Sequence, residues 1–152
     1  SLTRAQFAAL LVRALGVPRA SGSGGRFADV SAQHWAFAEV EAATAAGLVT
    51  GVAPDRFDPE RSITRQEMAT MLVRAAAWAG RPLTAPGGVD ATLAGFADAA
   101  SIAPWAREAV AAAVGSSLML GRTSNEWVPL GTATRAEAAV VIKRLMVALG
   151  LL

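Results

Sequence analysis

ITRQEMATMLVR, residues 63–74, is the stretch that decides the fold of this 152-residue chain. Thr64 followed three residues later by Glu67 forms a capping box. In such a box the threonine oxygen accepts an amide proton of the first helical turn, and the carboxylate reaches back to the threonine amide. The apolar residues behind the box are spaced i, i+3, i+4 and i+7, as on the buried face of a helix. The stretch therefore predicts a helix that begins at Thr64 and packs one face against partners.

The same motif occurs twice more in the chain. Thr134 and Glu137 form a second capping box, and Thr3 with Gln6 forms its amide version near the start. An apolar stripe of equal spacing follows each one. The stripes are Phe7, Leu10, Leu11 and Ala14; Met68, Met71, Leu72 and Ala75; and Ala138, Val141, Ile142 and Leu145. Three equivalent helices with equivalent stripes predict a central cluster with pseudo-threefold symmetry.

Two longer segments that precede the second and third motifs also match each other. The matching positions are Phe27 and Phe96, Asp29 and Asp98, Trp35 and Trp105, Gly51 and Gly121, and Phe57 and Trp127. We expect the Phe27, Phe96, Phe57 and Trp127 rings to be core anchors.

Each of these segments predicts a first helix followed by a loop. Ser31 is placed to cap a helix that runs to about Ala46, and Gly47 suits the left-handed residue after a helix end. Ser117 replaces that glycine in the later copy, so we expect a different helix end there. Pro104 stands where a first-turn proline is tolerated.

The pattern divides the chain into half a repeat and two full repeats. We predict the second half of a repeat at 1–17, full helix-loop-helix repeats at 27–79 and 96–150, and linkers at 18–26 and 80–95, whose glycines and prolines disfavour helix and strand. The chain thus begins in mid-repeat. No useful stretch alternates with a period of two. The expected fold is all-α, one compact domain with tandem repeats in a pseudo-threefold bundle.

Composition excludes several classes of protein. Hydrophobic residues make up 53% and charged residues 17%, which favours a folded core over disorder. The chain has no cysteine and one histidine, His34, so we expect no disulfide, no metal site and no cofactor. The net charge is only +2 and the arginines are spread along the chain, which argues against nucleic-acid binding. The apolar run 145–152 is too short for a membrane span, and the N-terminus has no signal-peptide pattern.

The chain resembles the S-layer homology (SLH) domain family. The resemblance lies in the Phe-x-Asp-Val string from Phe27, the His-Trp-Ala string from His34, the Gly-Leu-Val-x-Gly string from Gly47 and the Ile-Thr-Arg-x-Glu string from Ile63. It covers nearly the whole chain. Copy one lacks the first half of the pattern, which predicts one incomplete groove, and copy three departs from it at Ala99, Ala103 and Ser117.

The resemblance implies the function. SLH modules come in threes, fold as a pseudo-trimer and anchor surface proteins non-covalently to the bacterial cell wall. Their ligand is a secondary cell wall polysaccharide, often pyruvylated, which binds in grooves between repeats. The arginine of the Thr-Arg motif is a groove residue in the family, which here means Arg4, Arg65 and Arg135. The expected location is extracellular, at the cell surface.

The residue types fit a carboxylate on a sugar. Arginine after a helix cap can make a two-pronged contact with a carboxylate, tryptophan can stack on a sugar face, and glycine lets backbone amides approach a ligand. The predicted carbohydrate-binding residues are Arg4, Arg65, Arg135, Trp35, Trp105, Asp29, Asp98, Gly51 and Gly121. The predicted structural caps are Thr3, Gln6, Thr64, Glu67, Thr134 and Glu137.

Each assignment has a structural alternative. Arg65 can pair with Glu67 or Asp58, both tryptophans can pack into the core, and Asp29 and Asp98 can cap helices instead of binding hydroxyls. Arg13, Arg74 and Arg144 recur ten residues after each motif threonine, as salt-bridge partners or second anion contacts.

Two other classes of function make different demands on these residues. A glycosidase needs a pair of carboxylates, and the repeated acids have capping roles instead, so an enzyme is disfavoured. A protein–protein or lattice-assembly module is the alternative, since the incomplete first repeat leaves apolar stripes through which chains can associate.

Overall fold

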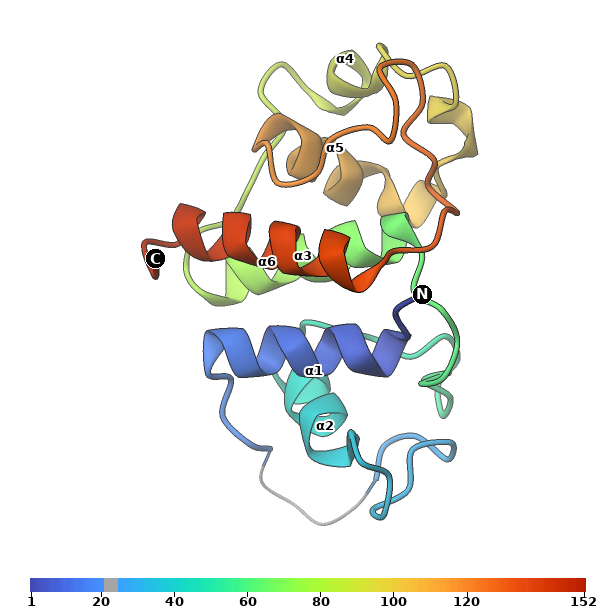
Figure 1. Ribbon diagram of the computed structural model, residues 1–152, viewed down its shortest axis with the longest axis vertical. Helices are drawn as coiled ribbons and strands as arrows, with labels where there is room; N and C mark the ends of the chain where they lie inside the picture. The colour runs from blue at the N-terminus through green and yellow to red at the C-terminus, as the bar shows by residue number, and fades with distance from the viewer. Residues whose placement is uncertain (21–24) are drawn as a thin grey trace.

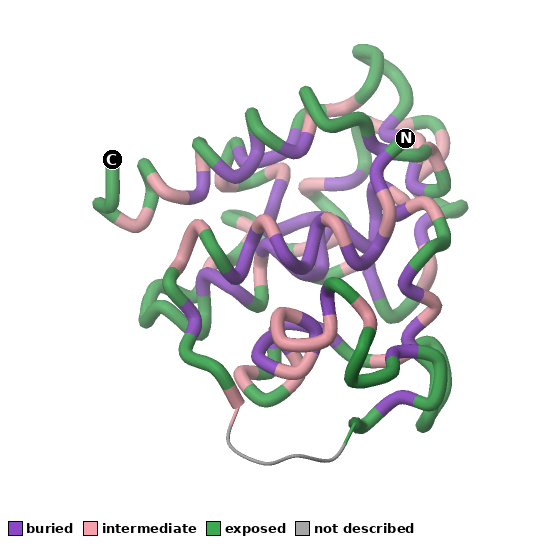
Figure 2. Tube along the Cα trace, turned by 60° about the horizontal axis from the view of Figure 1, so that its bottom comes forward, coloured by how far each residue is buried: buried purple, intermediate pink, exposed green. Residues whose placement is uncertain are grey.

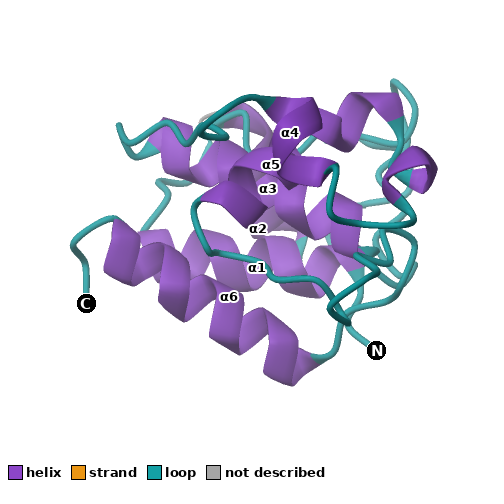
Figure 3. Cartoon of the chain, turned by 90° about the horizontal axis from the view of Figure 1, so that it is seen from above, coloured by secondary structure: helices purple, strands orange, loops and turns teal. Residues whose placement is uncertain are grey.

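The computed structural model describes residues 1–20 and 25–152, which form helices joined by loops (Figure 1, Figure 3). Residues 21–24, in the middle of the predicted linker 18–26, lie outside this description. The helices are α1 (Arg4–Leu15), α2 (Phe37–Ala45), α3 (Arg65–Trp78), α4 (Val89–Leu93), α5 (Arg107–Gly115) and α6 (Arg135–Ala148), with 3-10 turns η1 (Ala99–Ser101) and η2 (Pro104–Ala106). Within the described ranges the only β-pairing is three isolated bridges, so the all-α prediction is confirmed.

The three motif helices, α1, α3 and α6, begin where the capping motifs predict. The Thr3 oxygen accepts from the Gln6 amide at 3.1 Å, and the Thr3 amide donates to the Gln6 side chain at 2.9 Å. Thr64 and Glu67 make the same reciprocal pair. Thr134 accepts from the Glu137 amide at 3.1 Å, but the Glu137 carboxylate does not return to Thr134. The third capping box is therefore half formed, because that carboxylate binds arginines instead.

The first helices of the full repeats begin later than the sequence predicts. α2 starts at Phe37, and Ser31 caps nothing, because residues 31–36 form turns. His34 accepts the Ala36 amide through Nδ1 within these turns, at 3.0 Å. Pro104 opens η2 as expected.

The helix-end residues also differ from expectation in one copy. Gly47 takes the predicted left-handed conformation, with φ of 79°. Ser117 takes it too, with φ of 59°, so the prediction of a different helix end in the later copy was wrong. The predicted linker 80–95 contains α4, which its composition disfavoured, and Leu93 at the end of α4 is fully buried.

The three motif helices contact one another in pairs. Two of them, α1 and α3, also pack on the first helix of the following copy. α1 packs against α2, and α3 packs against α5 (Figure 1). One continuous apolar core runs between these elements. α6 has no comparable first-helix partner among the described residues, and its outer face is exposed (Figure 2). Ala69 of α3 is buried, for example, whereas the equivalent Ala139 of α6 is exposed.

Candidate functional site

The arginine that begins α1 inserts into the loop of the following copy. Arg4 Nε donates to the Phe57 carbonyl at 2.9 Å, and Nη2 donates to the Thr50 carbonyl at 3.2 Å. Nη1 forms an ion pair with Glu67, at the start of α3. The guanidinium also lies 4.7 Å from the centre of the Phe57 ring. Arg4 is therefore buried, and each of its donor nitrogens has a partner inside the protein.

Arg65 repeats this arrangement one copy later. Its Nε donates to the Trp127 carbonyl at 3.0 Å, its Nη2 donates to the Leu120 carbonyl at 2.6 Å, and its Nη1 pairs with Glu137 at 3.2 Å. The alternative that Arg65 pairs with Glu67 or Asp58 was therefore wrong, because the partner belongs to the next copy. The motif arginine thus ties the helix start of one copy to the loop and helix start of the following copy.

Arg135, the third motif arginine, has no such environment. It is exposed and forms no hydrogen bond or ion pair with the residues that the structure describes. The equivalent motif arginines are both almost completely buried. The sequence equivalence of the three arginines therefore does not extend to their surroundings.

Glu67 is the anionic centre of the first of these contacts. Its carboxylate accepts from the Thr64 amide at 3.0 Å and from Arg61 at 2.9 Å, and it pairs with Arg4. Burial raises the pKa of Glu67, but the Thr64 amide and the two guanidinium groups outweigh it, so this pKa lies below its usual value. Burial lowers the pKa of Arg4, the Glu67 charge raises it, and burial is the larger effect, so this pKa lies below its usual value. Both groups are charged at neutral pH.

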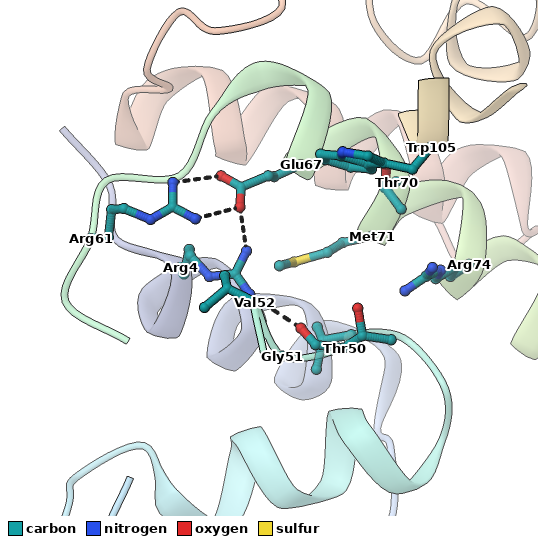
Figure 4. Close-up of a pocket in the computed structure, with 11 residues that line it drawn as sticks. Arg4, Thr50, Gly51, Val52, Arg61, Glu67, Thr70, Met71, Arg74 and Trp105 are labelled. Atoms are coloured by element: carbon teal, nitrogen blue, oxygen red, sulfur yellow. Dashed lines mark hydrogen bonds and ion pairs between the residues drawn. The ribbon is translucent and has the colours of Figure 1, made fainter. Parts of the chain in front are cut away.

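A hollow of about 390 Å³ opens beside this ion pair (Figure 4). We call it the first groove. Its lining comprises Arg4, Val49, Thr50, Gly51, Val52, Arg61, Glu67, Thr70, Met71, Arg74 and Trp105. In Figure 4 the Trp105 ring covers one side and the 50–52 loop lies opposite, while Arg74 stands at the end away from Arg4 and Arg61. Three separate copies of the repeat thus build one concave site.

A second groove of about 410 Å³ stands at the equivalent place one copy later. It is lined by Arg65, Met119, Leu120, Gly121, Arg122, Ala136, Glu137, Val140, Val141 and Arg144. Leu120 and Val140 take the places of Thr50 and Thr70, so this groove is more apolar, and no tryptophan lines it. Arg144 donates to the Leu118 carbonyl at 3.3 Å, whereas Arg74 of the first groove forms no bond within the described chain.

The two equivalent tryptophans are both on the surface, so the alternative of core packing was wrong. Trp35 is 53% exposed and Trp105 is 61% exposed. Only Trp105 lines a hollow described here, and Trp35 lies beside His34 instead. A large exposed ring at the rim of a concave site is typical of a ligand platform.

Asp29 and Asp98 hold loops and do not cap helices. Asp29 accepts the amides of Phe57 and Asp58 at 2.9 and 2.8 Å, and Asp98 accepts the amides of Trp127 and Val128 at the same distances. Asp58 and Val128 have left-handed φ values of 64° and 61°, which the two bonds help to fix. Burial raises the pKa of Asp29, but the two amide donors outweigh it and leave that pKa below its usual value.

Gly51 and Gly121 are required by the packing of their own loops. A Cβ on Gly51 would lie 2.5 Å from the Phe27 ring, and one on Gly121 would lie 2.7 Å from the Phe96 ring. Both glycines also line a groove. The Gly51 amide donates to no group in the described ranges.

The four predicted core anchors differ in how far they are buried. Phe27, Phe57 and Trp127 are buried as expected, whereas Phe96 is half-buried against the core.

Two groove residues were missed by sequence reasoning, Arg61 and Arg122. Arg61 bonds Glu67, and Arg122 bonds the equivalent Glu137 at 2.9 Å. They occupy different positions within the repeat, three and twelve residues ahead of the motif threonine, so aligning the copies does not reveal their shared role.

Two features are absent from the described part of the chain, a metal-holding group of side chains and a membrane-spanning helix. No group of three histidine, aspartate or glutamate side chains there is arranged to hold a metal ion. None of its helices has both the length and the apolar character needed to cross a membrane.

Comparison with known proteins identifies the repeats. The S-layer homology domain model matches residues 26–69 and 95–139. An endoglucanase of Bacillus sp. (strain KSM-635) is 38% identical over 96% of this chain, which corresponds to 15% of that protein. The surface-layer 125 kDa protein of Lysinibacillus sphaericus is 31% identical over 95% of this chain and 12% of that protein. An amylopullulanase of Thermoanaerobacterium thermosulfurigenes is 36% identical over 96% of this chain and 8% of its own length.

The chain therefore spans a small part of each of these relatives, which are an endoglucanase, an amylopullulanase and a surface-layer protein. The two full repeats each match the family model from the Phe-x-Asp string into the motif helix. The chain belongs to the S-layer homology domain family.

Proposed function

We propose that the chain is a non-catalytic module that anchors its protein to the bacterial cell wall by binding an acidic, pyruvylated wall polysaccharide. The observation that carries the proposal is the first groove. It combines an exposed tryptophan ring with a guanidinium and a backbone amide that bond to no other group in the described ranges, contributed by Trp105, Arg74 and Gly51.

The charge of the first groove supports an anionic ligand. Its lining contains three arginines and one glutamate, an excess of two positive charges. Arg4 and Arg61 are held by Glu67, so they maintain the local positive field, while Arg74 is available for direct contact. A pyruvate ketal supplies one carboxylate on an otherwise neutral sugar, which matches one open guanidinium beside an aromatic platform.

The single carboxylate of this groove argues against turnover of the bound glycan. Glycosidases place two carboxyl groups on either side of the scissile bond. Glu67 is the one acidic residue in the lining, and two arginines bind it. The groove lining therefore offers no acid/base pair to cleave a bound glycan.

Purified cell-wall sacculi of the host bacterium test the proposal. The chain is expected to co-sediment with intact sacculi, and removal of the pyruvate ketal or of the whole polysaccharide is expected to abolish this. Trp105→Ala and Arg74→Gln are expected to weaken binding at least tenfold. Trp35→Ala is the matched control, because Trp35 is also more than half exposed but does not line the first groove. Undiminished binding to stripped walls, or equal losses in all three variants, would contradict the proposal.

We further propose that α1, α3 and α6 are related by a pseudo-threefold axis, because the three helices contact each other and carry equivalent stripes. Under that symmetry α1 and α3 have a first-helix neighbour, and α6 lacks one in the described chain.

The exposed side of α6 favours a second candidate function, association with another chain. Ala136, Ala139, Val140 and Val147 are exposed on it, and the small alanines allow close helix approach. Light scattering across a concentration series tests this. A mass that rises with concentration in the unmodified chain, and stays monomeric in Val140→Lys, is the expected result. A concentration-independent monomer would exclude self-association through α6.

A further inference from the structure

The first groove does not end at Trp105. Three of its lining residues, Thr70, Arg74 and Trp105, also line a separate hollow of about 490 Å³ between α3, α5 and residues 83–89. We call this the distal hollow. Two hollows that share three wall residues are adjacent, and each falls within the roughly 300–1,000 Å³ that ligand sites occupy.

The outer wall of the distal hollow is a built feature of the fold. Gly115 at the end of α5 allows residues 84–86 to lie directly on the helix, since a Cβ there would stand 2.8 Å from Pro86 and 3.3 Å from the Ala85 Cα. Beyond this contact the chain turns through Gly87 and Gly88, both left-handed, into α4. Leu93 of α4 is fully buried in the core.

An ion pair also links α4 to α5. Arg107 of α5 pairs with Asp90 of α4 at 3.0 Å, and it donates to the Ala99 carbonyl at 3.1 Å. Because the Asp90 side chain is 96% exposed, this pair adds little, and the packing of residues 84–86 on Gly115 is the main contact that holds the wall.

The chemistry of the distal hollow differs from that of the first groove. One arginine and one glutamate, Arg74 and Glu108, line it, so its charges balance. The other lining residues are neutral, with Thr84 the only polar side chain apart from the shared Thr70. A charge-balanced wall beside an aromatic ring suits the face of an uncharged sugar better than it suits an acidic one.

The corresponding hollow of the preceding copy has no tryptophan in its lining, and its counterpart of Arg74 is paired. It lies between α1 and α2, measures about 340 Å³ and includes Arg13, the counterpart of Arg74. Arg13 is bound to Glu39 at 3.0 Å. Ala109 occupies the position of Glu39 in the later copy, which leaves Arg74 without that partner, and Trp35 does not line the earlier hollow.

We propose that the ligand site is one extended groove, in which the acidic end sugar binds between the 50–52 loop and Trp105 and the next, uncharged sugar units of the same wall glycan bind in the distal hollow. This inference rests on the function proposed above and adds the length of glycan that is recognised. Trp105 and Arg74 stand at the junction, where they contact both parts of the chain of sugars.

Calorimetric titration with wall-glycan fragments of defined length tests the extended groove. The probes are a pyruvylated monosaccharide and fragments of two to four units released from purified sacculi. The unmodified chain is expected to bind the longest fragment about tenfold more tightly than the monosaccharide, a change of about 1.4 kcal/mol.

Two variants block the distal hollow from opposite walls. Ala109→Phe and Thr84→Trp each place a large side chain in it, and neither residue lines the first groove. Both are expected to bind the monosaccharide normally and to lose the gain with length. Ala38→Phe fills the hollow beside Arg13 and is the matched control, expected to keep the gain.

The outcomes separate this inference from the proposed function. Binding of the monosaccharide with no gain for longer fragments overturns the extended groove alone. A gain that persists in both blocking variants also overturns it. If neither the monosaccharide nor any fragment binds the unmodified chain, the proposed function fails together with the extended groove.

Discussion

Glu67→Gln isolates the charge that holds the first two copies together. Glutamine keeps the reciprocal cap, as Gln6 does natively in copy one, so only the negative charge is removed. Arg4 then remains as a cation that is 4% exposed, with two carbonyl partners and a ring but no counter-ion.

The magnitude follows from that burial. Removing one partner of a buried ion pair costs about 3–5 kcal/mol. Because the Arg4 carbonyl bonds remain, we expect the low end, about 3 kcal/mol. For a domain of this size such a loss lowers Tm by about 6–12 °C. Urea unfolding followed by circular dichroism measures the free energy, and the slope m shows whether the transition stays two-state.

Glu137→Gln is the matched control. Glu137 has a side chain that is 31% exposed, compared with 10% for Glu67, and its partner Arg65 also has two carbonyl acceptors. We expect an intermediate loss of about 2 kcal/mol, because the Arg65 cation left behind is as buried as Arg4 while Glu137 itself is nearer to the exposed pairs. If both variants lose the same stability, or if Glu67→Gln loses less than the control, the contribution of the Arg4–Glu67 pair to the free energy of unfolding does not depend on its burial.

Three further outcomes follow from the same contacts. The pKa of Glu67 is depressed in the folded protein, so its charge stabilises the fold fully above the unfolded pKa of about 4.3, and this stabilisation is lost as the pH falls through the folded pKa. The free energy of unfolding should therefore fall less steeply with decreasing pH in Glu67→Gln than in the unmodified chain, and equal slopes would refute this. Asp29→Ala removes the acceptor of two loop amides and should cost about 1–2 kcal/mol while speeding hydrogen exchange at Phe57; unchanged exchange would show that the loop is held by other contacts. Gly51→Ala forces a Cβ against Phe27 and should cost about 1–3 kcal/mol in thermal unfolding, and a neutral result would mean the loop adjusts freely.

The helix starts were the most predictable part of the fold, because a capping box is a local signal. Thr64 and Glu67 satisfy each other within one turn, and no distant residue is needed to form that start. The start of α2 was missed for the opposite reason. Its N-cap is Ala36, which makes no side-chain bond, and the turn before it depends on the His34 ring.

The candidate site was predictable as a set of residue types but not as a set of partners. Arg65 stands only two residues before Glu67 in sequence, and yet it bonds Glu137 in the next copy. Which arginine remains open to a ligand depends on contacts across copies, such as the Arg13–Glu39 pair that Arg74 lacks. Repeat spacing records equivalence of position and does not record which neighbour each side chain meets.

The exchange of side chains between copies has a consequence for how this protein can be taken apart. A repeat cut out by itself would carry a guanidinium whose acceptors belong to its successor, and a loop whose buried cation belongs to its predecessor. In such a fragment the guanidinium would lack its acceptors and the loop carbonyls would lack their donor, and both ends would be destabilised. Grafting one repeat onto another scaffold would therefore require the adjoining helix start and loop as well, so the smallest transferable unit is the junction between repeats.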